Sequence, residues 1–184
     1  MAHQFVFLLS DTEKTYLKDL VRRSIASGLA ESAEEPPTPP TDKLRESLGA
    51  FVTLTLDGDL RGCIGNVQGA GELWRTIWNM ARAAAFSDPR FPPLTPEEFE
   101  RIEYEISILS PLEPCPDVNE VVVGRHGLIM QRGGLSGLLL PQVPVALGWN
   151  RVQFLEQTCR KAGLPADSWR KAGTNIYWFE AEVF

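Results

Sequence analysis

Cysteines and long apolar runs are scarce in this chain of 184 residues. Its three cysteines, at positions 63, 115 and 159, are an odd number without a CxxC pair, which argues for reduced thiols rather than a disulfide framework. The apolar run over residues 5–9 is too short for a signal peptide or a membrane span. We therefore expect a cytoplasmic protein that makes no membrane contact.

Positively charged residues are also fewer than negatively charged ones. Lys and Arg number 18 against 24 Asp and Glu, which gives a formal net charge of −6 at pH 7. Nucleic-acid binding depends on a basic surface, and the sequence shows no basic stripe, so we expect no nucleic-acid partner. The GxGxxG and GxxxxGK[ST] phosphate-binding motifs are absent as well. A hydrophobic content of 43% and this length are ordinary for one soluble globular domain.

The order of the periodic segments predicts an α+β fold. Residues 10–13 have the form of a capping box and begin an amphipathic helix over 11–29, while residues 31–42 form an extended proline-rich connector. Because the strands come mainly as hairpins, we expect a mostly antiparallel sheet with packed helices. The expected elements after the connector are a hairpin at 50–56 and 60–64, helices at 71–86 and from Thr95, a strand at 102–109, a hairpin at 127–131 and 135–140, a helix at 150–162 and a strand at 174–183.

The segment from Leu60 to Gly65, LRGCIG, concentrates the candidate chemistry. Gly62 and Gly65 let backbone or a ligand approach closely. Arg61 lies two positions before Cys63 on a strand, hence on the same face, and its charge favours a thiolate. Two interpretations follow: Cys63 is a nucleophilic or redox cysteine, or it is a small buried hydrophobe whose glycines serve packing.

A second group of candidates lies elsewhere in the chain. His126 sits in a tight turn, where it either transfers protons with Glu105 or Asp88 orienting the imidazole, or bonds to nearby backbone. The rigid corner Asp88-Pro89-Arg90 offers Arg90 for an anionic ligand or for an ion pair with Asp88 or Glu105. These residues and Cys63 have no recognised metal-ligand spacing, so we expect no metal site. The sequence does not identify a cofactor.

The LRGCIG segment resembles the six-residue signature of the AMMECR1 domain, and the resemblance covers residues 10–184 as a single domain. It implies two lobes, one large and one small, around a cleft that holds the signature motif. Residues 50–95 would contribute much of the smaller lobe, with 31–42 as the connector. The further segments that resemble family motifs are residues 83–94, 105–109, 124–128, 137–143 and 161–165.

The resemblance implies partners more clearly than a reaction. Bacterial and archaeal members are similar to the A component of the AmmeMemoRadiSam set, which also includes a Memo-like protein and a radical SAM protein. Our leading hypothesis is a cleft that binds or transforms a small anionic substrate. Cys63 would contact the substrate, Arg61 and Arg90 would bind its anionic group, and His126 or Glu105 would transfer protons. The alternative is a non-catalytic partner or delivery module for a Memo-like or radical SAM protein.

Overall fold

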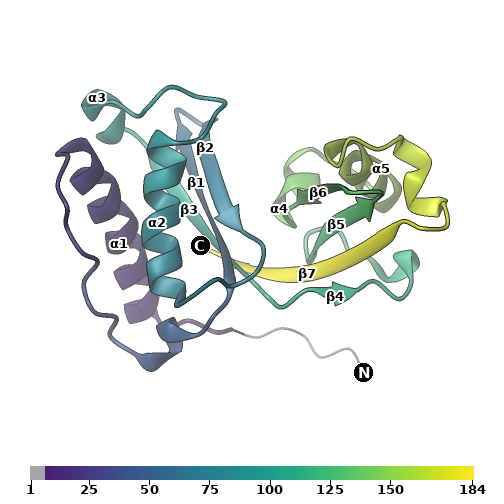
Figure 1. The fold of residues 1–184 in the computed structure, drawn as a ribbon, viewed down its shortest axis with the longest axis horizontal. Coiled ribbons are helices and arrows are strands. Elements are labelled where there is room, and N and C mark those ends of the chain that lie inside the picture. The colour runs from purple at the N-terminus through teal and green to yellow at the C-terminus, as the bar shows by residue number, and fades with distance from the viewer. Residues whose placement is uncertain (1–6) are drawn as a thin grey trace. The chain divides into compact units, whose positions relative to one another are not determined.

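The computed structural model describes residues 7–184, so residues 5 and 6 of the N-terminal apolar run lie outside it. The described residues form helices and antiparallel strands, which confirms the α+β class (Figure 1). Among them, no helix is both long enough and apolar enough to cross a membrane. The elements are α1 (Asp11–Leu29), β1 (Gly49–Leu56), β2 (Asp59–Asn66), α2 (Leu73–Phe86), α3 (Pro96–Phe99), β3 (Glu103–Leu109), β4 (Glu113–Pro114), β5 (His126–Arg132), β6 (Leu135–Leu139), α4 (Gln142–Ala146), α5 (Arg151–Lys161) and β7 (Asn175–Val183).

The chain forms two compact units. We call residues 7–109 with 182–184 the N-terminal unit, and residues 110–181 the C-terminal unit. Residues 50–95, which the family resemblance gives largely to a smaller lobe, lie in the N-terminal unit, which has the longer stretch of chain.

The N-terminal unit packs α1 and α2 side by side, with α2 against the sheet β2-β1-β3 (Figure 1). The capping box begins α1 as predicted, because the Ser10 hydroxyl accepts from the Glu13 N–H and the Glu13 carboxylate accepts from the Ser10 N–H. The last three residues of the chain belong to this unit, where the N–H of Ile106 donates to the Phe184 carbonyl at 2.9 Å. The fully buried side chains of the unit include Leu17, Leu20, Ile25, Val52, Leu54, Leu73, Ile77, Ile106 and Ile108.

The C-terminal unit contains the sheet β7-β5-β6, with β4 paired to β7 and α5 packed on β5 and β6. Its core gathers Leu128 and Met130 of β5 around Phe154, Leu155 and Cys159 of α5. The short helix α4 was not predicted from the sequence. Its proline, at position 144, stands in the first turn, where the missing N–H has no helical acceptor.

Both glycines that flank Cys63 are required by packing. A Cβ on Gly62 would lie 2.2 Å from the carbonyl oxygen of Ala84 in α2, and one on Gly65 would lie 2.3 Å from the ring of Phe51. The glycines of the signature segment therefore have a structural cause that needs no ligand.

We expect Gly62→Ala to lower the free energy of unfolding by about 2–3 kcal/mol, because the added methyl group meets backbone of α2 that cannot rotate away. Urea titration measures the change. Gly58→Ala is the matched comparison, since nothing lies within 4 Å of its Cβ and its cost, about 1 kcal/mol, comes only from the positive φ of 87°. Equal costs at the two positions would contradict the packing explanation.

Candidate functional site

A β-bulge in β2 decides which face of the sheet carries Cys63. Unbroken pairing outward from the turn after Leu56 would put Cys63 opposite Val52, which is fully buried on the face that packs against α2. Instead, the pairing register shifts, and Arg61 is an extra residue of β2 that has no partner on β1. This shift of one residue places Cys63 opposite Thr53 and so on the other face of the sheet.

Thr53, Cys63 and Glu105 consequently form a row across three strands. Thr53 of β1 pairs with Cys63 of β2 on one side and with Glu105 of β3 on the other. The Thr53 hydroxyl donates a hydrogen bond to Cys63 Sγ at 3.3 Å. Since neighbouring strands lie about 4.8 Å apart, the Cα atoms of Cys63 and Glu105 are about 10 Å apart, with Thr53 between them.

Asp88 and Arg90 hold the backbone of Cys63 at the outer edge of β2. The Cys63 N–H donates to Asp88 Oδ2 at 2.9 Å, and Arg90 Nη2 donates to the Cys63 carbonyl at 3.3 Å. β2 is the edge strand of this sheet, and a further strand would offer the same acceptor and donor. The two side chains thus take the place of a neighbouring strand, and we call this arrangement the Asp88–Arg90 clamp.

The clamp is an ion pair, as one of the sequence interpretations of Arg90 held. Asp88 is 4% exposed and accepts from Arg90 Nε at 2.9 Å and Nη2 at 2.7 Å. These bonds hold the pKa of Asp88 well below its usual range; burial opposes them, and the Cys63 N–H adds to the lowering. The pKa of Arg90 is raised, chiefly by its hydrogen bonds to Asp88, and burial opposes the rise.

Arg61 has a different partner from the one expected. The sequence predicted that it would share a face with Cys63, but the bulge interrupts the alternation on which this rested. The Arg61 side chain is nearly buried and binds both carboxylate oxygens of Glu98 in α3, at 2.8 and 2.9 Å, as well as the Pro92 carbonyl at 3.0 Å. This bidentate bond raises the pKa of Arg61 and lowers that of Glu98.

His126 lies in the C-terminal unit and has the contacts of a turn histidine. Its Nδ1 accepts from the Val122 N–H at 3.2 Å, so the neutral ring carries its proton on Nε2. Burial lowers its pKa, Arg125 lowers it further, and Glu180 opposes both. The carboxylate near the imidazole is Glu180, 4.0 Å from Nε2 and bonded to Arg125 at 2.6 Å, rather than the expected Glu105 or Asp88. The imidazole ring of His126 also packs against the ring of Trp178, with the two ring centroids 4.5 Å apart.

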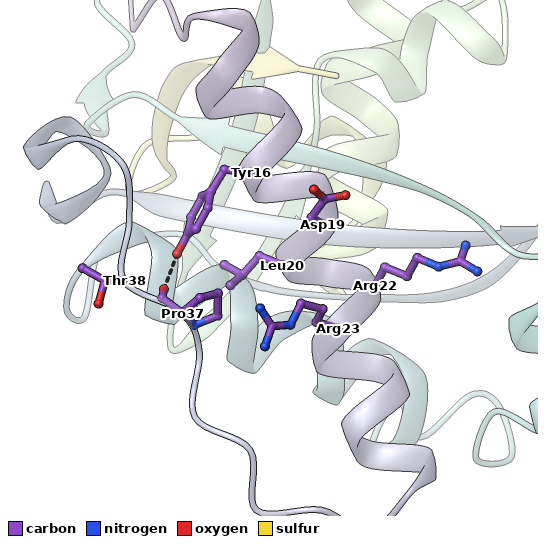
Figure 2. Close-up of a pocket in the computed structure, with 7 residues that line it drawn as sticks. All are labelled: Tyr16, Asp19, Leu20, Arg22, Arg23, Pro37 and Thr38. Atoms are coloured by element: carbon purple, nitrogen blue, oxygen red, sulfur yellow. Dashed lines mark hydrogen bonds between the residues drawn. The ribbon is translucent and has the colours of Figure 1, made fainter.

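A hollow of about 380 Å³ lies apart from Cys63, between α1 and the proline-rich connector (Figure 2). The Tyr16 hydroxyl donates to the Pro37 carbonyl at 2.6 Å. Burial raises the pKa of Tyr16 to about 12, so the hydroxyl remains a donor well into the alkaline range. Arg23 forms an ion pair with Glu34. Tyr16 and Arg23 therefore fasten the connector to α1.

Within residues 7–184, no three His, Cys, Asp or Glu side chains gather in a way that could hold a metal ion. The candidate site is therefore a half-buried thiol with a hydroxyl beside its sulfur and an ion pair on its backbone, set on an antiparallel sheet of an α+β protein.

Comparison with known proteins assigns the chain to a family. The AMMECR1 family model matches residues 18–184, so the chain belongs to the AMMECR1 family. Relatives include Protein MK0488 of Methanopyrus kandleri, 45% identical over 94% of this chain and 87% of the relative, and Protein NEQ441 of Nanoarchaeum equitans, 40% identical over 91% and 97%. The crystal structure of the uncharacterized protein PH0010 from Pyrococcus horikoshii superposes with a TM-score of 0.90 at 38% identity, covering 97% of this chain and 93% of that one.

Sequence reasoning missed Thr53, Glu98 and Glu180. Thr53 looks like an ordinary strand residue, and the two-residue turn at 57–58 pairs it with Gly62 unless a bulge is assumed. Glu98 and Glu180 are each one of two glutamates on their elements, α3 and β7. No local signal identifies any of the three.

We expect Asp88→Asn to lower the free energy of unfolding at pH 7 by about 2 kcal/mol, because it removes the charged acceptor of the clamp. The pKa of Asp88 is lowered on folding, so its stabilisation is complete above the unfolded value of about 3.9 and is lost as the pH falls below it. The difference between the two proteins should therefore shrink between pH 7 and pH 3 in urea titrations.

The control is Asp59→Asn, an exposed aspartate on the same strand, which should change stability by less than about 0.5 kcal/mol. A loss at position 88 that is the same at both pH values would rule out the charge as its cause.

Proposed function

We propose that this AMMECR1-family protein binds a small anionic substrate on the face of β1–β3 that Cys63 shares with Thr53, and that the Cys63 thiol contacts or attacks it. The observation that carries the proposal is the Asp88–Arg90 clamp. It fixes both the N–H and the C=O of the cysteine and puts a guanidinium next to that carbonyl. A preorganised thiol beside a cation is the usual arrangement of a reactive cysteine.

Arg90 is the anion-binding residue in this proposal. Its Nε and Nη2 are taken up by Asp88 and the Cys63 carbonyl, but no described residue accepts a hydrogen bond from Nη1. Its side chain is 46% exposed, so this edge of the guanidinium can receive a carboxylate or phosphate oxygen. Arg61 is left out of ligand binding because its side chain is nearly buried, with Nε and Nη2 bonded to Glu98 and Pro92.

Glu105 is the candidate proton-transfer group. It shares the face with Cys63, two strands away, and a substrate that spans Thr53 would contact both. His126 is not needed for this role, since its Nδ1 is bonded to backbone and its pKa is lowered by burial.

The alternative function is a non-catalytic partner module for a Memo-like or radical SAM protein. Two observations favour it: packing alone accounts for Gly62 and Gly65, and the C-terminal unit leaves Val145 and Leu147 more than half exposed around α4. Under this alternative the Cys63 thiol has no special reactivity, and the partner is retained in a pull-down.

Paired alkylation with iodoacetate, an anion, and iodoacetamide, its neutral analogue, separates the two functions. We expect Cys63 in the folded protein to react with iodoacetate, relative to iodoacetamide, roughly threefold to fivefold more than in the urea-unfolded chain, because Arg90 attracts the carboxylate. Arg90→Gln should abolish this preference. Mass spectrometry measures the alkylation rate of each cysteine-containing peptide. Half-buried Cys115 is the internal reference, because Cys159 is buried.

Arg101→Gln is the matched control, since Arg101 is an exposed, ion-paired arginine of the same unit. It should leave the preference unchanged. If Cys63 shows no anion preference and reacts no faster than Cys115, the substrate-site proposal fails and the partner-module alternative stands.

A further inference from the structure

We propose that the Thr53 hydroxyl stabilises the anionic form of the Cys63 sulfur, which makes Thr53 a positioning residue of the site. This inference rests on the proposed function, because it takes Cys63 as the reactive group. It adds a residue from β1 to a site whose other members come from β2, from β3 and from the segment after α2.

The hydroxyl is held in place before any substrate arrives. Thr53 lies in the central strand of β2-β1-β3, so both neighbouring strands fix its backbone. A β-branched side chain has few χ1 rotamers available in a strand, which limits the directions in which the hydroxyl can point. Its oxygen lies 3.3 Å from Cys63 Sγ, within range of a hydrogen bond to sulfur.

A donor at this distance discriminates between the two forms of the sulfur. A neutral thiol is a weak acceptor, whereas a thiolate accepts strongly, and a hydrogen bond to a charged group contributes more than one between neutral groups. Thr53 acts directly on the sulfur, while the Asp88–Arg90 clamp acts on the backbone of the same residue. The two supports are therefore separable by mutation.

Strand propensity alone does not distinguish Thr53 from its neighbour Thr55. Both are half-buried threonines of β1 that alternate onto the same face, and threonine is favoured in strands generally. Of these two threonines, only Thr53 donates a hydrogen bond to a sulfur atom. Thr55 thus provides a control that matches Thr53 in residue type, strand and burial.

The experiment is the rate of Cys63 alkylation by neutral iodoacetamide between pH 6 and pH 10.5. In this reaction the thiol first loses its proton to solvent, and the S–C bond then forms as iodide leaves. We expect Thr53→Val to react about tenfold more slowly than the unmodified sequence at pH 7, from the loss of one hydrogen bond to a charged atom. At pH 10.5, where thiols are ionised in both proteins, the rates should converge.

Thr53→Ser, which keeps the hydroxyl, should restore most of the rate at pH 7, and Thr55→Val should leave the whole profile unchanged. An unchanged profile in Thr53→Val would overturn the inference. So would an equal loss at every pH, because that pattern reports altered access to the sulfur rather than a stabilised anion.

Failure here is distinguishable from failure of the proposed function. The anion preference of Cys63 depends on Arg90 and is measured as a ratio of two reagents, whereas the role of Thr53 is measured with the neutral reagent alone. A preserved anion preference with an unaltered pH profile in Thr53→Val would remove Thr53 from the site and leave the substrate proposal standing.

Discussion

The one-residue bulge at Arg61 is the constraint on which the arrangement around Cys63 depends. Side chains alternate along a strand, so a single extra residue exchanges the two faces for everything that follows it. Without the bulge, Cys63 would point into the apolar layer under α2 and could serve only as a packing residue. With it, the sulfur meets a hydroxyl on the opposite face. The bidentate Arg61–Glu98 bond, nearly buried, holds the extra residue and so ties the register of β2 to α3.

The residues of the signature segment therefore have different roles, which the sequence alone does not distinguish. Arg61, Gly62 and Gly65 support the fold. Arg61 bonds to Glu98 at the bulge. Gly62 leaves room for the backbone of α2, and Gly65 leaves room for the ring of Phe51. The guanidinium bonded to the Cys63 carbonyl is that of Arg90, which follows Pro89 and reaches the edge of the strand. A segment can contain several residues of types that are common in active sites, although most of them only hold one neighbouring residue in place.

Much of the fold could be predicted from the sequence because its signals are local. The capping box that begins α1 and the glycine turns that close both hairpins are set by residues a few positions apart. The candidate site was only partly predictable. Asp88 and Arg90 could be expected to pair, but the bulged Arg61 binds a glutamate 37 positions away. The place of Thr53 beside Cys63 follows from the bulge. Long-range partners of this kind leave no periodic pattern.

The membership of residues 182–184 in the N-terminal unit has a consequence for biosynthesis. A ribosome releases residues 7–109 first, yet the backbone bonds between Ile106 and Phe184 and the ion pair between Lys14 and Glu182 must wait until every residue of the C-terminal unit has emerged. From its own synthesis until residues 182–184 emerge, β3 therefore has one side of its hydrogen-bonding groups unmatched. The N-terminal unit is therefore the first to be synthesised and the last to be completed.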